Sequence, residues 1–170
     1  MNIEKIDIAK FIEKLTSDYR PQAEAKGLKM VSIIDEGVST IMTSQLYLRE
    51  ILQNFITNSI KYTEKGQISI SVGGTANKVV FNVKDTGIGI SKSDQNKLFK
   101  KFFRSDDFRV KKASGTGLGL FVTAKLIKLV NASLSIESDL NQGTEAILSV
   151  PNIEPALYDA LSDNQLAKPQ

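Results

Sequence analysis

Two glycine-rich segments that flank a basic stretch constrain this chain more than any other feature. Residues 85–90 read DTGIGI, and residues 114–120 read SGTGLGL, beginning 25 residues after Gly89. Either segment alone is common in loops, but together they place one carboxylate and two glycine clusters around a run of cations. Together with the upstream series Glu50-x3-Asn54-x3-Asn58-x2-Lys61 on a predicted helix, the pattern favours an ATP site. It is not of the P-loop or dinucleotide kind, because GxxxxGK[ST] is missing and SGTGLGL does not follow a strand within a βαβ unit.

Residues 44–62 are predicted to form a helix with two distinct faces. At 100° per residue, Glu50, Asn54, Asn58 and Lys61 fall within about 80° of one another. The opposite arc, expected to pack on a sheet, holds Leu48, Ile51, Leu52, Phe55, Ile56 and Ser59. Asn is a poor helix former, so two in mid-helix indicate a function. Amide oxygens can ligate Mg²⁺, and amide NH₂ groups can donate to phosphate. The alternative is an ordinary solvated helix face, and this alternative carries more weight for Asn58 than for Asn54.

Two residue types are missing from the sequence. The 170 residues contain no Cys, which excludes disulfides, thiolate metal sites and cysteine nucleophiles. They contain no His, which excludes His general bases, Ser-His triads and His metal ligands. A metal in this chain must therefore be a hard cation held by oxygen ligands, and Mg²⁺ is the leading candidate.

The positive charge of the chain is concentrated between the glycine clusters. Its net charge is +3, but residues 92–112 hold eight Lys/Arg against three Asp. A solvated loop is the usual explanation of such a run, and the interleaved phenylalanines leave nucleic-acid binding as a second. We favour a third, a mobile lid over a polyphosphate at about residues 91–114. A hydrophobic plug is expected to seat this lid, formed by Phe99, Phe102 and Phe103.

The remaining periodicity predicts one α/β domain over residues 1–151, with helices on one face of a sheet. Helices are expected at 6–26, 44–62, 93–103 and 117–130, although Pro21 makes the last turn of the first doubtful. Strands are expected at 28–34, 40–42, 67–72, 78–84, 134–137 and 144–150. Residues 152–170 are expected to form a poorly ordered tail. No apolar run approaches the roughly 18 residues of a membrane helix.

Five segments together resemble the catalytic ATP-binding domain of sensor histidine kinases, in the superfamily that includes gyrase and the mismatch-repair ATPases. In chain order they are similar to the N box (49–63), G1 box (83–90), F box (98–104), G2 box (114–120) and final hairpin (142–151). The resemblance covers about residues 5–151. It implies a Bergerat fold, a two-layer α/β sandwich with a mixed, mostly antiparallel sheet and helices on one face. It also implies that ATP and Mg²⁺ bind.

The resemblance assigns an expected role to each matching residue of the long helix and the first glycine cluster. Asn54 is the implied Mg²⁺ ligand, with Asn58 and Lys61 on phosphate oxygens and Tyr62 against the adenine. Asp85 is expected to accept from the adenine amino group, because an ionised Asp only accepts. The backbone is expected to approach the base at Gly87, Gly89 and Ile90. Thr144 is expected to border the adenine pocket.

The second glycine cluster is expected to shape the path of the chain where it leaves the lid, and the helix after it to offer free N–H groups to phosphate. The cluster comprises Gly115, Thr116, Gly117, Leu118, Gly119 and Leu120. Arg104, with Arg109 or Lys111, is expected to neutralise the γ-phosphate. Glu50 has the spacing of a water-activating Glu in the ATPase relatives, but in histidine kinases that task belongs to the phosphoacceptor domain. Glu50 is therefore expected to orient Lys61 or a metal-bound water.

The chain departs from the family pattern in three respects. Ser59 stands where the family usually has Ala, and Thr43-Ser44 replaces an acidic residue before the long helix while keeping an N-cap hydroxyl. A larger departure is the missing phosphoacceptor His. We therefore expect a fragment of a larger kinase, cytoplasmic or the cytoplasmic part of a membrane-bound sensor.

The resemblance implies transfer of the γ-phosphate of ATP·Mg to a His on a separate dimerisation domain of the same full-length protein, in two-component signalling with a response regulator. No nucleic acid and no membrane contact are expected for this domain. Alone, it should be inactive for lack of an acceptor. The alternative is a nucleotide-binding regulatory module or pseudokinase, against which Asn54, Lys61 and Arg104 argue. A serine-kinase anti-sigma factor is disfavoured by the F box and the N-terminal extension.

Overall fold

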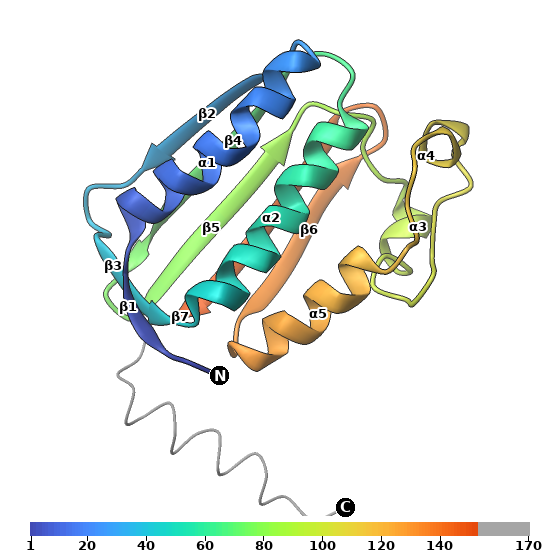
Figure 1. The fold of residues 1–170 in the computed structure, drawn as a ribbon. Coiled ribbons are helices and arrows are strands. Elements are labelled where there is room, and N and C mark those ends of the chain that lie inside the picture. Colours follow the sequence, from blue (N-terminus) through green and yellow to red (C-terminus); the bar gives the residue numbers. More distant parts are fainter. Residues whose placement is uncertain (153–170) are drawn as a thin grey trace, which may run out of the picture.

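Five strands form one sheet in the computed structural model, which describes residues 1–152 (Figure 1). Their order across the sheet is β2 (Lys29–Ile34), β4 (Gln67–Thr75), β5 (Lys78–Asp85), β7 (Gly143–Pro151) and β6 (Ser133–Asp139). β2 and β4 run parallel, and the other neighbours run antiparallel. The expected two-layer sandwich with a mixed, mostly antiparallel sheet is confirmed.

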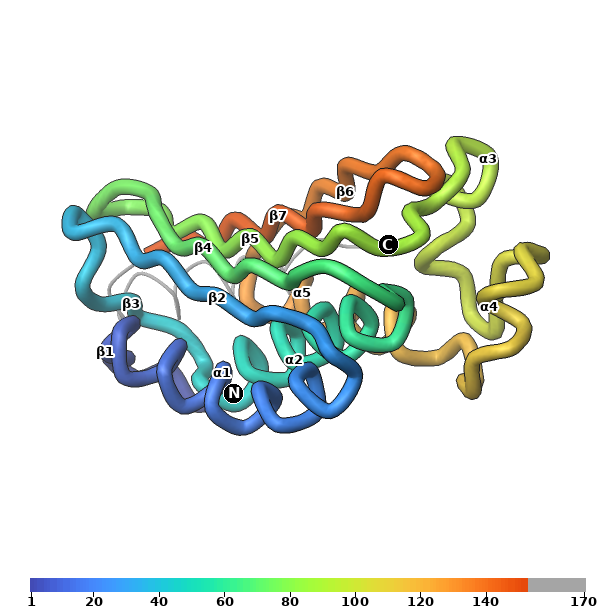
Figure 2. Tube along the Cα trace, turned by 90° about the horizontal axis from the view of Figure 1, so that it is seen from above, coloured from blue at the N-terminus to red at the C-terminus, as the bar shows by residue number. Residues whose placement is uncertain are grey.

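Three helices cover one face of the sheet, as the view from above shows (Figure 2). They are α1 (Ile8–Ala25), α2 (Gln45–Tyr62) and α5 (Gly119–Leu129). Two short helices, α3 (Lys92–Gln95) and α4 (Phe108–Lys112), belong to a segment that extends beyond one end of the sheet. This segment corresponds to the expected lid, and below we use that name for residues 91–114.

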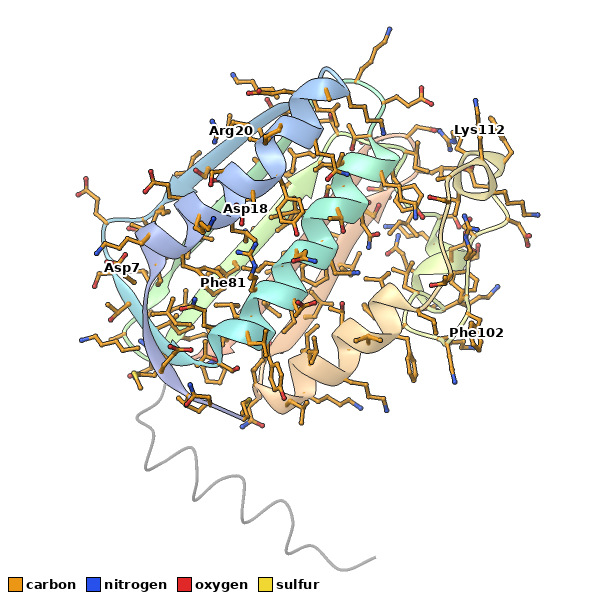
Figure 3. All side chains as sticks on the ribbon, in the orientation of Figure 1. Asp7, Asp18, Arg20, Phe81, Phe102 and Lys112 are labelled. Atoms are coloured by element: carbon orange, nitrogen blue, oxygen red, sulfur yellow. The ribbon has the colours of Figure 1, made fainter. Side chains whose placement is uncertain are left out.

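Helix α2 packs on the sheet with the face that the periodicity predicted. The Ser44 hydroxyl caps its first turn by accepting from the Tyr47 N–H at 3.5 Å. The buried residues of α2 are Leu48, Ile51, Leu52, Phe55, Ile56, Ser59 and Ile60. They meet fully buried sheet residues such as Phe81, which lies beneath the helices in Figure 3. Burial of this apolar arc leaves the Asn54–Lys61 face of the helix directed away from the sheet.

The N-terminal segment differs from the sequence prediction. A helix was expected over 6–26, but residues Glu4–Asp7 form strand β1, and α1 begins at Ile8. β1 pairs with β3 (Thr40–Thr43), a strand more than 30 residues away, and such a non-local partner leaves no local signal. Pro21 lies within α1, and the helix nevertheless continues to Ala25.

The lid also differs from its prediction. A helix expected over 93–103 is reduced to α3, and α4 was not predicted; its cap is Asp107, which accepts from the Arg109 N–H at 2.9 Å. Phe102 has a φ of 62° and is 63% exposed, and Figure 3 shows it on the outer side of the lid. Phe102 is therefore not part of the expected plug, because a plug residue has to be buried.

The chain after β7 is described only as far as Asn152. The sequence predicts that this residue belongs to the tail, but its side chain accepts from the Met42 N–H at 2.8 Å and donates to the Ala76 carbonyl at 2.9 Å. Asn152 therefore belongs to the folded domain. The rest of the predicted tail, 153–170, lies outside the described residues.

Candidate nucleotide site

The site is organised around one buried carboxylate at the end of β5. Asp85 is 7% exposed, and its register places it opposite Thr144 of β7. Its Oδ1 accepts from the Gly87 N–H at 2.9 Å and from the Thr144 N–H at 3.2 Å. Its Oδ2 accepts from the Ser59 hydroxyl of α2 at 2.9 Å. Two strands, a loop and a helix therefore hold this carboxylate in one orientation.

Burial raises the pKa of the Asp85 carboxyl above its ordinary value of 3.8. The hydrogen bonds from Gly87, Ser59 and Thr144 act in the opposite direction, because each donates to the charged form. A buried carboxylate that lines a cavity, and to which no cation of residues 1–152 is bonded, is a typical functional-site signature.

A cavity of about 740 Å³ opens between the polar face of α2, the ends of β5 to β7 and the lid. Most of the residues expected from the sequence line it: Asn54, Asn58, Lys61, Tyr62, Asp85, Gly89, Ile90, Arg104, Gly115, Thr116, Gly117, Gly119, Leu120 and Thr144. The volume suits a nucleotide-sized ligand.

Glu50, Gly87 and Leu118 are not among the lining residues. Glu50 is exposed on α2, ahead of Asn54. Gly87 lies behind the carboxylate, where a Cβ would come within 2.7 Å of the Thr63 hydroxyl and 2.9 Å of Asp85 Oδ1. Gly87 thus leaves room for its own N–H to reach Asp85, without touching the ligand space.

The glycines of the second cluster lie against the polar face of α2. A Cβ on Gly119 would come within 2.6 Å of Asn54 Nδ2, and one on Gly115 within 2.7 Å of Lys61 Nζ. Gly117 has a φ of 73°, a conformation that side-chain-bearing residues rarely adopt. Because Gly119 and Gly115 have no side chain, the start of α5 can approach Asn54, and the residue that follows the lid can approach Lys61.

Two amides on α2 form a pair in the cavity wall. Asn58 Nδ2 donates to Asn54 Oδ1 at 3.2 Å. A carbonyl oxygen has two lone pairs, so Asn54 Oδ1 keeps one for a further donor or a cation. Within residues 1–152 there is no cluster of three or more Asp, Glu, His or Cys that suits a metal. The donor set therefore fits Mg²⁺ only when phosphate oxygens and water complete its shell, which is how this ion usually binds.

Arg104 lines the cavity while it holds the lid together. Its guanidinium donates to the carbonyls of Val110 and Ala113 at 2.5 Å and to that of Gly115 at 3.1 Å. Arg109, the other expected arginine, does not line the cavity. Its guanidinium donates to the Asp107 carboxylate and to Asn141 Oδ1, the latter at 2.7 Å. The hydrogen bonds from Arg109 lower the pKa of Asp107 to about 2.

Lys111 also lies outside the cavity wall and pairs with Asp106 at 2.9 Å. Of the three cations expected near the γ-phosphate, only Arg104 therefore borders the ligand space in this structure.

The sequence reasoning missed part of the wall. The missed polar and charged residues include Ser59, Ser91, Asp94, Lys97, Asp106 and Asp107, and the apolar ones include Val83, Ile88, Leu98, Phe103, Ile136, Leu140 and Ala146. Ser59 had a signal, since it is the polar residue on an otherwise apolar arc. The apolar strand residues Val83, Ile136 and Ala146 had none, because alternation predicts that a strand residue is buried but not that it borders a cavity.

Comparison with known proteins now decides the family. The model of the histidine kinase-, DNA gyrase B- and HSP90-like ATPase family matches residues 43–154. The chain belongs to this ATPase family. As an ATPase domain it is of the kind found in histidine kinases of two-component systems.

Two relatives show where such ATPase domains occur. Hybrid signal transduction histidine kinase B of Dictyostelium discoideum is 36% identical over 132 residues, which cover 74% of this chain and 7% of that protein. Sensor protein SrrB of Staphylococcus aureus is 31% identical over 156 residues, covering 91% of this chain and 26% of that protein. The chain thus spans about a quarter or less of the length of these relatives.

Solved structures share the fold of this ATPase domain. Full-length ShkA in complex with AMPPNP aligns with a TM-score of 0.80 and 26% identity, over 89% of this chain and 31% of that one. The catalytic domain of histidine kinase ThkA aligns with a TM-score of 0.77 and 21% identity, over 89% and 99%. None of the helices in residues 1–152 combines the length and apolar character that a bilayer crossing needs.

Proposed function

We propose that this ATPase domain binds ATP with Mg²⁺ and donates the γ-phosphate to a histidine on a separate dimerisation domain. The observation that carries the proposal is the arrangement of the cavity. One part of its wall is the buried carboxylate of Asp85, and another part carries two amides, a lysine and an arginine beside the second glycine cluster. An adenine amino group fits the first part, and a polyphosphate fits the second.

The base end is built by Asp85 and its surroundings. Asp85 Oδ2 accepts a hydrogen bond from the adenine amino group, and apolar wall residues such as Val83, Ile136 and Ala146 contact the ring. Thr144 borders the same space, and Tyr62 lies along the base. Family membership supports this assignment, and the ShkA structure contains an ATP analogue.

The phosphate end is built by α2 and the start of α5. Asn54 Oδ1 would hold Mg²⁺, which would neutralise phosphate charge when bound, and Asn58 and Lys61 donate to phosphate oxygens. Helix α5 begins at Gly119 beside Asn54 and has no side-chain cap, so its first N–H groups are available to a phosphate. Phosphoryl transfer leaves the protein little covalent chemistry, and this positioning accounts for most of its contribution.

Arg104 closes the phosphate end from the lid. Its three carbonyl contacts place the guanidinium on the cavity wall, where it neutralises charge on the γ-phosphate. The acceptor comes from elsewhere, because the 170 residues contain no His. A response regulator then receives the phosphate from that histidine, in keeping with the sensor kinases among the relatives.

Transfer of label from γ-labelled ATP tests the proposal. The chain is mixed with a histidine-containing dimerisation domain, and each polypeptide is resolved separately. We expect an acid-labile phosphate on the added domain and none on this chain, and the Asn54→Ala variant should not support transfer. Acid-stable label on this chain would refute the proposal. Tight ATP binding without transfer to any such domain would favour the regulatory module.

A further inference from the structure

Ser59 is a polar residue in an otherwise apolar contact. It is 5% exposed and lies on the sheet-facing arc of α2, among buried Leu52, Phe55 and Ile56. Its hydroxyl donates to Asp85 Oδ2 at 2.9 Å, and Ser59 also lines the cavity. A buried hydroxyl at this position needs a partner, and the carboxylate supplies it.

The bonds to Asp85 leave one acceptor position unused. An ionised carboxylate has about four lone-pair sites. Oδ1 uses two of them, on the N–H groups of Gly87 and Thr144, and Oδ2 uses one on Ser59. The remaining site lies on Oδ2 and can accept one hydrogen from a ligand in the cavity.

We propose that Ser59 is a positioning residue that fixes the Asp85 carboxylate, so that this single acceptor selects an adenine amino group over the guanine carbonyl. The inference rests on the proposed nucleotide function. Guanine presents a carbonyl where adenine has its amino group, and a carboxylate repels it. Without the Ser59 donor, Asp85 loses the bond that holds Oδ2, and its protonated form, which can donate to a carbonyl, is favoured.

The protonation of Asp85 provides a readout that a packing role of Ser59 would not change. The Ser59 bond lowers the pKa of Asp85 against the raising effect of burial. Removing the Ser59 bond therefore raises the pKa of Asp85 further. As the pH is lowered, ADP affinity should begin to fall at a higher pH in the variant than in the wild type. Other ionisable groups on the same cavity wall are Lys61, Tyr62, Asp94, Lys97, Arg104, Asp106 and Asp107, while Lys84 and Glu145 pair with each other at 3.2 Å.

The test compares Ser59→Ala and Ser59→Cys with the wild type. Calorimetry measures ADP and GDP affinity from pH 5 to pH 8, and ¹³C NMR titrates the Asp85 carboxyl without nucleotide. We expect ADP affinity to fall about five- to tenfold at pH 8 in Ser59→Ala. The ADP/GDP ratio should fall, and the pKa of Asp85 should rise. Cys, a weaker donor of similar size, should give intermediate values.

Thr16→Ala is the matched control, since Thr16 is a buried hydroxyl on α1 that bonds the Ile12 carbonyl at 2.8 Å, outside the cavity. It should change thermal stability without changing nucleotide selectivity or the Asp85 titration. An unchanged Asp85 pKa in Ser59→Ala, or an equal loss of ADP and GDP, would overturn the inference. A wild type that binds neither nucleotide would instead refute the proposed function, while the NMR titration still tests the Ser59–Asp85 contact.

Discussion

Replacing Asp85 by asparagine should exchange an acceptor for a donor at the base end of the cavity. Two backbone N–H groups, from Gly87 and Thr144, already point at Oδ1. In Asp85→Asn the new amide oxygen must take that position, because an NH₂ group there would face two donors. The NH₂ group then replaces Oδ2, next to Ser59 and the ligand space, where the Ser59 hydroxyl can turn to accept from it.

The size of the effect follows from the bond that is lost. A hydrogen bond to a charged group contributes about 1.5–3 kcal/mol. At about 1.4 kcal/mol per tenfold, ADP affinity should fall about 10- to 150-fold. ATP should lose the same factor, because the contact is to the base and not to the phosphates. GDP should lose less than ADP, since the new NH₂ can donate to the guanine carbonyl.

The same variant should change how stability depends on pH. Burial raises the pKa of Asp85 above its ordinary value of 3.8, so the folded protein binds this proton more tightly than the unfolded chain. The resulting stabilisation is complete below the ordinary value and is lost as pH rises through the folded-state pKa. The amide of the variant does not titrate. Urea unfolding at a series of pH values should therefore show a smaller loss of stability, as pH rises above the ordinary value of 3.8, in Asp85→Asn than in the wild type.

Calorimetry with ADP, ATP and GDP measures the affinities, and circular dichroism confirms the fold. Asp35→Asn is the matched control, because Asp35 is an exposed carboxylate that does not line this cavity. It should leave all three affinities unchanged. The assignment of Asp85 to the base is wrong if Asp85→Asn folds and keeps wild-type ADP affinity, or if it loses ATP and retains ADP.

Three further predictions concern the phosphate end and the lid. Asn54→Ala should remove the Mg²⁺-dependent part of ATP affinity without unfolding the chain, because Asn54 faces away from the sheet. Calorimetry with and without Mg²⁺ measures this affinity, and an unchanged Mg²⁺ dependence would contradict the prediction. Arg104→Ala should weaken ATP more than ADP in the same assay, and equal losses would place Arg104 away from the γ-phosphate. Trypsin should cut first among the eight Lys/Arg of residues 92–112 and more slowly with a non-hydrolysable ATP analogue, whereas equal rates would argue against a closing lid.

Much of the fold was predictable, because its strongest signals are local. The apolar arc of α2 was visible as a helical period, and the strands β4, β5 and β7 as alternation. β1 was not predictable, because its partner β3 lies more than 30 residues away. α4 was missed as well, because it has five residues, too few for a period, and begins at a single capping aspartate.

The sequence by itself determined which side chains the chain can bring to a nucleotide. The spacing from Asn54 to Lys61 sets one helix face, and the glycines at 115, 117 and 119 allow close approach wherever the chain returns to it. Only the tertiary structure decided how Asp85 is held. Its donors Ser59 and Thr144 lie 26 and 59 residues away, and they meet it because α2 packs on the sheet and β5 pairs with β7. Local periodicity fixes the face on which a residue lies, but the partner of a buried polar group depends on packing between distant elements.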